Sequence, residues 1–276
     1  EAFVVGGCVR DSLISKVPDD WDICTNALPD EIKHCFSMVQ TIDTGLKYGT
    51  VTVVIDHMML QITTYRLDLS YSDYRRPDHV AFTPSLEEDC RRRDFTVNAM
   101  AYNPKTGLVD FFGGLEDLSN KKIRCVGDAN KRFSEDALRI LRALRFSSVL
   151  CYEIEENTVA AIHQNKQLLQ YISSERILSE INKLLFGMNV EHVLRAYPDV
   201  FEVFLPEVSF LYEKKDSTGS RMWDHIASSI GKASSKLSVR TALLFHEMER
   251  DPGESALIAQ RTLERWKADK DGIRKT

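Results

Sequence analysis

The chain has 276 residues, of which 43% are hydrophobic and 28% are charged, a composition typical of a globular protein with more than one packed unit. The formal net charge of -5 argues against a surface that binds polyanions over its whole extent, and no apolar run approaches the roughly 20 residues that cross a bilayer. The six cysteines are scattered and the start shows no signal-peptide pattern, so we expect reduced thiols, a cytoplasmic protein and no membrane partner.

Residues 1 to about 112 alternate short β-branched runs with turns, which predicts a mixed α/β unit. Residues 50–55 and 59–65 flank a two-residue turn region and predict a β-hairpin, while residues 29–36 have helical character. Residues 66–84 are polar and contain two prolines, which predicts a long loop. Long loops in compact domains are usually functional or mobile.

From about residue 131 the pattern becomes helical. Ala137, Ile140, Leu141 and Leu144 recur at i, i+3, i+4 and i+7, which is the stripe of an amphipathic helix. Similar periodicity continues in residues 159–172, 177–185 and 239–248. Residues 214–220 read as a linker, and after residue 251 the pattern fades, so we expect the end of the chain to be cut short or poorly packed. The predicted fold class is therefore α+β, with a small mixed sheet followed by helical domains.

The first chemically informative residues lie in the run GGCVRD, which contains Gly6, Gly7 and Arg10, and in the D-W-D that joins Asp20 to Asp22. Two glycines after a strand let the backbone approach a phosphate, and an arginine can fork onto two triphosphate oxygens. Asp20 and Asp22 are two apart on an expected strand, so both carboxylates leave the same face and repel each other unless a cation lies between them. Mg²⁺ is the natural occupant, although a D-x-D pair alone is also typical of a solvated turn.

Together these motifs resemble the head of the nucleotidyltransferase superfamily shared with DNA polymerase β. The closest resemblance is to its class II tRNA nucleotidyltransferase branch, which includes bacterial poly(A) polymerases, and the segment RRRDFTVNA resembles that branch's second motif. The resemblance implies that catalytic Asp20 and Asp22 hold Mg²⁺ and that Arg93 binds the triphosphate. It also implies that Asp94 and Asn98 lie near the sugar.

A third motif contains Asp136, Arg139, Arg142 and Arg145, which recur every three residues and would drift across one exposed side of a helix. Periodicity alone favours an ion-paired surface helix. The resemblance instead implies that Asp136 and Arg139 are a protein template for the incoming base. Cytosine and adenine present an amino donor beside a ring-nitrogen acceptor, which an Asp acceptor and an Arg donor match, whereas uracil and guanine present the reverse. For Arg142 and Arg145 we expect contacts to phosphates or support of that pair, within a segment (residues 121–150) that has eight Lys and Arg against three Asp and Glu.

Residues 68–84 resemble the flexible loop that family members need in order to add a terminal A. The resemblance therefore implies a CCA-adding enzyme, which adds C, C and A to the 3′ end of its partner tRNA from CTP and ATP. An A-adding enzyme and a bacterial poly(A) polymerase stay open as alternatives. The implied domains are a nucleotidyltransferase head over residues 1–120, a base-reading helical neck over 121–172 and a helical body over 173–276 whose end is incomplete or degenerate. Neither the oligomeric state nor the tRNA preference follows from the sequence.

Two departures from the family pattern matter. Gln61 stands where many relatives have an acidic residue as a third carboxylate. This glutamine is either natural variation or a substitution made to slow the enzyme. It is the one feature that favours a catalytically silent RNA-binding relative. His246 and Glu247 are similar to the His-Asp signature of phosphohydrolases, but a single histidine without a partner cluster is expected to be structural. The segment around Arg176 resembles a helical motif that braces the base-reading helix.

Overall fold

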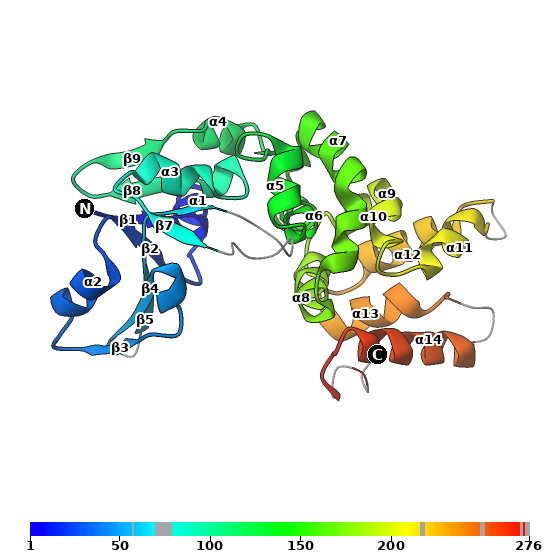
Figure 1. Ribbon diagram of the computed structural model, residues 1–276. Helices are drawn as coiled ribbons and strands as arrows, with labels where there is room; N and C mark the ends of the chain where they lie inside the picture. Colours follow the sequence, from blue (N-terminus) through cyan, green and yellow to red (C-terminus); the bar gives the residue numbers. More distant parts are fainter. Residues whose placement is uncertain (57, 70–78, 216–218, 249–251, 271–272, 274–276) are drawn as a thin grey trace. The chain divides into compact units, whose positions relative to one another are not determined.

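The computed structural model describes residues 1–56, 58–69, 79–215, 219–248, 252–270 and 273, and for residue 252 the backbone alone. These residues fall into two compact units, which we call the first unit (up to Arg132) and the second unit (from Phe133). The first unit carries the main sheet and the second is built from helices (Figure 1). The predicted α+β fold class is confirmed.

The first unit is built on a seven-stranded mixed sheet in the order β3-β4-β5-β2-β1-β8-β9. Neighbouring strands are antiparallel except β2 and β5, which are parallel. The strands are β1 (Ala2–Val5), β2 (Asp22–Thr25), β3 (Gln40–Ile42), β4 (Thr50–Ile55), β5 (Met58–Thr64), β8 (Met100–Asn103) and β9 (Gly107–Asp110). The helices are α1 (Gly7–Leu13), α2 (Pro29–Cys35), α3 (Leu86–Arg91) and α4 (Gly114–Ser119), with the 3₁₀ turns η1 (Leu46–Tyr48) and η2 (Thr96–Asn98); β10 (Lys122–Ile123) follows, and α5 (Ala129–Glu135) crosses the division.

Alternation of apolar residues along the strands builds one core of this unit. Val51 and Val53 of β4 are fully buried and pack with Ile62 of β5 and Ile32 of α2. The predicted hairpin is therefore confirmed, because β4 and β5 pair directly, and the predicted helix at residues 29–36 is confirmed as α2.

The predicted long loop at residues 66–84 is wrong at both ends. Strand β6 (Arg66–Asp68) pairs with β7 (Val80–Phe82) in a separate antiparallel ribbon. Polar composition did not reveal this ribbon, because its backbone groups pair with each other whatever the side chains are. Within residues 68–84, which resemble the A-adding loop, residues 70–78 lie outside the described part of the chain.

The second unit buries the apolar stripe that the sequence predicts. Ala137, Ile140, Leu141 and Leu144 have no exposed surface, and α6 (Leu138–Leu150) packs against α8 (Ser174–Leu185) and α9 (Val190–Ala196). The remaining elements are β11 (Glu153–Ile154), α7 (Glu156–Asn165), η3 (Lys166–Tyr171), α10 (Pro198–Phe201), α11 (Glu207–Glu213), α12 (Met222–Lys232), α13 (Leu237–Phe245) and α14 (Pro252–Arg265). Close approach requires a glycine just beyond α8, since a Cβ at Gly187 would lie 2.0 Å from Ser148 Oγ.

Two expectations about the C-terminal part are wrong. The predicted linker at residues 214–220 lies inside the second unit, where α11 packs against α12; residues 216–218 lie outside the described part of the chain. Polar composition alone does not distinguish a surface turn from an interdomain linker. The expected poor packing after residue 251 does not hold either, because Leu263 and Trp266 are buried, and the Trp266 ring centroid lies 5.9 Å from that of Phe204.

Candidate functional site

The turn between β1 and α1 requires glycine at its first position. Gly6 has φ 86° and ψ -133°, a left-handed conformation that other residues rarely adopt. A Cβ at this position would lie 3.2 Å from Nη1 of Arg93. Gly6 therefore lets an arginine from the second motif approach the backbone of the first, which the sequence did not reveal. The nucleotide contact predicted for Gly7 stays a prediction.

Arg10 joins the first two motifs. Its buried guanidinium donates to both carboxylate oxygens of Asp11 at 2.8 and 2.9 Å and to Oδ1 of Asn98 at 2.5 Å. The Asn98 amide in turn donates to Asp94 Oδ1 at 3.1 Å, and that oxygen also accepts the Phe95 N–H at 2.8 Å. Residues 88 positions apart thus share one polar network. The guanidinium of Arg10 binds Asp11 in this structure, and the predicted contact of Arg10 with a triphosphate stays a prediction.

The two predicted metal-binding carboxylates lie at the exposed start of β2. Asp22 is the first residue of the strand, but Asp20 precedes it, so the prediction that both lie on one strand is wrong for Asp20. The strand begins at Asp22, where β2 first pairs with β5 through Gln61, and β1 joins one residue later, with Val4 opposite Ile23. Although Asp22 is accessible to solvent, the surrounding protein atoms partly desolvate its carboxylate and raise its pKa; Arg93 lowers this pKa, Asp20 raises it, and the net effect is upward.

Gln61 lies directly beside Asp22. The parallel register of β2 and β5 pairs these two residues, and paired residues in a parallel sheet point to the same face. Both residues are exposed. The predicted position of Gln61 next to Asp22 is therefore confirmed. Two carboxylates whose repulsion a cation would relieve, with an amide oxygen nearby, form an oxygen donor set that fits a hard divalent ion such as Mg²⁺.

Asp89 is a residue whose role the sequence analysis missed. It is fully buried at the end of α3, where its Oδ1 accepts two hydrogen bonds from Arg92, at 3.0 and 2.8 Å. Its Oδ2 accepts from Nη2 of Arg93 at 3.3 Å, and the Arg66 N–H donates to Oδ1 at 3.3 Å. Asp89 precedes Arg92 by three residues and Arg93 by four, a helical spacing that could have predicted these pairs.

Asp89 stabilises the charged form of Arg93 and orients its guanidinium. Burial by itself would lower the pKa of Arg93, but the Asp89 carboxylate raises it above its ordinary value. Burial would likewise raise the pKa of Asp89, but Arg92 and Arg93 together lower it. Because Arg93 also acts on the pKa of Asp22, the structure places a fixed positive charge within electrostatic reach of that carboxylate.

The third motif lies in the second unit and differs from the predicted surface stripe. Asp136 is not in a helix: it lies between α5 and α6, where its Oδ1 accepts the Leu138 N–H at 3.1 Å. Arg139 is 8% exposed and pairs with Glu135 at 2.8 Å. Arg142 and Arg145 are half-buried. The expected exposed side is wrong, because α6 packs against α8 and α9 and Arg139 is buried.

Helix α8 braces this motif, as expected. Arg176 binds the Asp136 carboxylate with two hydrogen bonds, Nη1 to Oδ1 at 3.3 Å and Nη2 to Oδ2 at 3.0 Å. Glu180 lies 2.6 Å from Nε of Arg145, whose guanidinium also stacks on the Phe146 ring at 3.9 Å. These contacts fix the positions of Asp136 and Arg145 before any ligand arrives.

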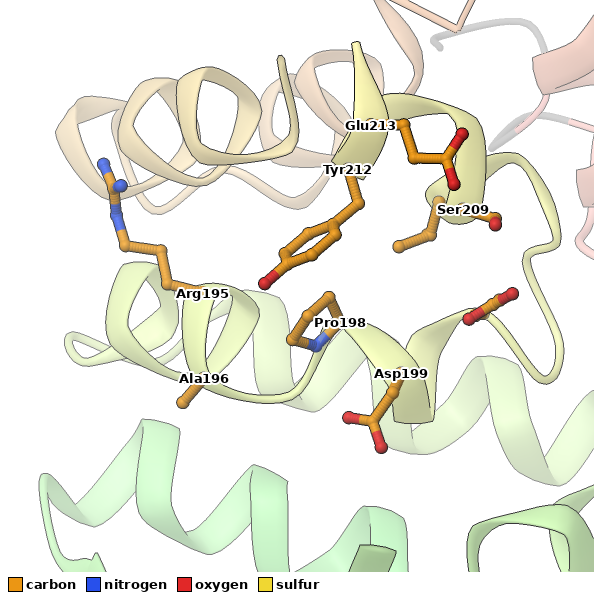
Figure 2. Close-up of a pocket in the computed structure, with 9 residues that line it drawn as sticks. Arg195, Ala196, Pro198, Asp199, Ser209, Tyr212 and Glu213 are labelled. Carbon is orange, nitrogen blue, oxygen red and sulfur yellow. The ribbon is translucent and has the colours of Figure 1, made fainter. Parts of the chain in front are cut away.

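A pocket elsewhere in the second unit has a different character. It has a volume of about 360 Å³ and lies between α9, α10 and α11 (Figure 2). Its described lining includes Asp199, Glu202 and Glu213 but only one arginine, Arg195, and none of the predicted site residues. Three carboxylates against one guanidinium disfavour a phosphate-bearing ligand there.

Comparison with known proteins identifies the family. The poly(A) polymerase head domain matches residues 2–124, and the probable RNA- and SrmB-binding site of polymerase A matches residues 151–211. The CCA-adding enzyme of Enterococcus faecalis is 49% identical over 189 residues, which cover 68% of this chain and 46% of that enzyme. The chain belongs to the family of tRNA nucleotidyltransferases and bacterial poly(A) polymerases.

Other members of this family are similar over most of the chain. The CCA-adding enzyme of Lactobacillus helveticus is 48% identical over 199 residues, 72% of this chain and 49% of that enzyme. The Bacillus stearothermophilus CCA-adding enzyme, solved in complex with CTP, superposes with a TM-score of 0.81 at 34% identity. The match covers 99% of this chain and 63% of the chain of that enzyme. The chain therefore spans about half the length of the curated relatives it matches. In the described parts of the chain, no helix is long and apolar enough to cross a membrane.

Proposed function

We propose that this chain catalyses the template-independent addition of C, C and A to the 3′ end of tRNA, from CTP and ATP and with release of pyrophosphate. The names of the relatives support this reading, as does the similarity to an enzyme that binds CTP. The observation that carries it lies in the first unit, where Arg93, held by Asp89, lies within electrostatic reach of Asp22, and the Asp20 carboxylate acts on the same group.

In the proposed reaction the tRNA 3′ oxygen attacks the α-phosphorus of the nucleotide, the bond between the α-phosphorus and the bridging oxygen breaks, and pyrophosphate leaves. Asp20 and Asp22, with Gln61 beside them, would hold Mg²⁺, which when bound favours loss of the hydroxyl proton and neutralises charge on the leaving group. Arg93 binds the triphosphate, and Asp89 holds its guanidinium in place. The protein contributes positioning and charge rather than a covalent intermediate.

Base selection is proposed to reside in the second unit. Asp136 accepts from the amino group of C or A, and Arg139 donates to the adjacent ring nitrogen. Arg176 and Glu135 hold these two side chains in the free protein, at 3.0 and 2.8 Å, so little reorganisation precedes base pairing. Arg145, held by Glu180, supports the pair, and Arg142 is proposed to contact phosphate.

Further proposals follow the family. We propose that the protein works in the cytoplasm and that it comprises a head over residues 1–120, a neck over 121–172 and a body over 173–276. An A-adding enzyme would extend only tRNA that already ends in CC, and a poly(A) polymerase would add long runs of A; we favour neither, because the relatives are named CCA-adding enzymes.

The metal site is tested by substitution. Asp20→Ala and Asp22→Ala should abolish transfer while leaving tRNA binding nearly intact, because carboxylates are needed to hold the ion and not the RNA. Asp19→Ala is the matched control, since Asp19 is an exposed neighbour in the same turn. Turnover in either of the first two variants equal to that of the control would remove the proposed site.

A further inference from the structure

The second unit brings together three potential metal ligands that the proposed transfer reaction does not use. His225 lies in α12, and His246 and Glu247 directly follow α13. One ligand atom of each lies within 4.8 Å of the other two. The expectation that His246 has no partner is wrong, because α12 packs against α13 and places the two imidazole rings 5.8 Å apart.

The hydrogen bonding of His246 prepares it for a metal. Its Nδ1 lies 2.6 Å from the carbonyl oxygen of Leu243. A carbonyl can only accept, so Nδ1 carries the hydrogen, and in the neutral ring Nε2 keeps its lone pair. Metal-binding histidines typically donate their other N–H to such a carbonyl. Nε2 lies 3.9 Å from Oε1 of Glu247, which places the two free ligand atoms side by side.

The spacing and exposure of the three side chains suit an ion. Ligand bonds of about 2.0–2.1 Å in a tetrahedral site set ligand atoms about 3.3 Å apart. Small side-chain rotations would close the present separation of up to 4.8 Å. His225 is exposed, and His246 and Glu247 are half-buried, so each can turn and an ion can reach them.

A cavity of about 470 Å³ adjoins the cluster, since His225 is among its lining residues. Arg195, Lys215 and Arg221 contribute three positive charges to that lining, against one carboxylate from Asp224. A coordination position on this side of the ion would be open to water or to an anion.

We propose that His225, His246 and Glu247 bind one divalent transition-metal ion, with at least one coordination position left open. Two imidazoles and one carboxylate are a donor set of the zinc and cobalt class, whereas Mg²⁺ prefers oxygen ligands alone. These three residues belong to the second unit, whereas the carboxylates of the proposed transfer site belong to the first.

Cobalt titration of the full chain tests the proposal without reading activity. Co²⁺ in a nitrogen-rich site of low coordination number absorbs in the visible, so the protein should show one saturable band per chain. His225→Ala, His246→Ala and Glu247→Gln should each weaken Co²⁺ binding at least about tenfold. His192→Ala removes an exposed histidine of the same unit, and Asp22→Ala removes the proposed ion site of the first unit; both should keep the band.

Thermal unfolding supplies a second readout. Zn²⁺ should raise the Tm of the parent and of His192→Ala but not that of the double variant His225→Ala/His246→Ala, because a ligand stabilises only the state that binds it. A band of unchanged affinity in the double variant, or a parent that shows no saturable band, would overturn the proposal. Circular dichroism in metal-free buffer confirms that the variants are folded.

Discussion

Replacing Asp89 with Asn tests whether a buried carboxylate positions the arginine proposed to bind triphosphate. The Asp89 side chain has no exposed surface, and the side chains of Arg92 and Arg93 that it binds are 18% exposed. Asn keeps the shape and one acceptor oxygen, but its NH₂ group must face a guanidinium, which can only donate. At least one charge-assisted hydrogen bond is lost, worth about 1.5–3 kcal/mol, and two cations lose their buried counter-charge. We expect the free energy of unfolding to fall by about 3 kcal/mol, which lowers the Tm by roughly 6–10 °C.

The same substitution should weaken nucleotide binding. With Arg93 no longer held, we expect KM for CTP at 25 °C to rise about tenfold, which corresponds to about 1.4 kcal/mol. Glu87→Gln in the same helix is the control, because its pair with Arg91 is about half exposed and is worth no more than about 1 kcal/mol. If Asp89→Asn matched Glu87→Gln in both Tm and KM, Asp89 would not position Arg93. A lower Tm with unchanged KM would make its role structural only.

The pH dependence of stability adds a third readout. Arg92 and Arg93 lower the pKa of Asp89 below its unfolded value of about 3.9, despite the opposing effect of burial. A carboxyl with a depressed folded pKa contributes its full stability above the unfolded pKa and loses it as the pH falls through the folded pKa. The difference in unfolding free energy between the parent and Asp89→Asn should therefore shrink below about pH 4. A difference that stays constant to low pH would contradict this assignment.

Three further substitutions test the proposed site. Asp22→Asn should raise the Tm in metal-free buffer near neutral pH while abolishing transfer, because a raised folded pKa means that the ionised carboxylate costs stability there; a lower Tm would contradict the raised pKa. Gln61→Glu should tighten Mg²⁺ binding or raise the rate, since it restores a carboxylate in register with Asp22; a metal titration and rate equal to the parent's would place Gln61 outside the metal site. Asp136→Ala should lose about ten- to a hundredfold in rate with CTP and ATP and lose discrimination against UTP and GTP; an equal loss with all four nucleotides would make Asp136 a structural residue.

Local patterns in the sequence predicted much of the fold. The alternation that buries Val51 and Val53 predicted the β4–β5 hairpin, and the stripe from Ala137 to Leu144 predicted the buried face of α6. Such patterns show which residues share one face of an element, because side chains on one face recur every two residues in a strand and about every 3.6 residues in a helix. The ion pairs of Asp89 could have been predicted in the same way, because its partners Arg92 and Arg93 lie one helical turn away in the sequence.

Contacts between distant segments could not be read in this way. Asn98 accepts from Arg10 across 88 positions, and Arg176 binds Asp136 across 40. The pairing of His225 with His246 likewise depends on how two helices pack. Charged residues at helical spacing read as a solvated face until tertiary packing is known, which is why the burial of Arg139 was missed.

Nucleotide incorporation is the most direct measurement of the proposed reaction. The chain is incubated with Mg²⁺ and tRNA that lacks CCA, with each labelled nucleotide alone and with CTP and ATP together. We expect two residues to be added from CTP alone, one further A when ATP is also present, and none from UTP or GTP. Extension only of tRNA that already ends in CC, long runs of A, or no incorporation from any nucleotide would contradict the proposed reaction.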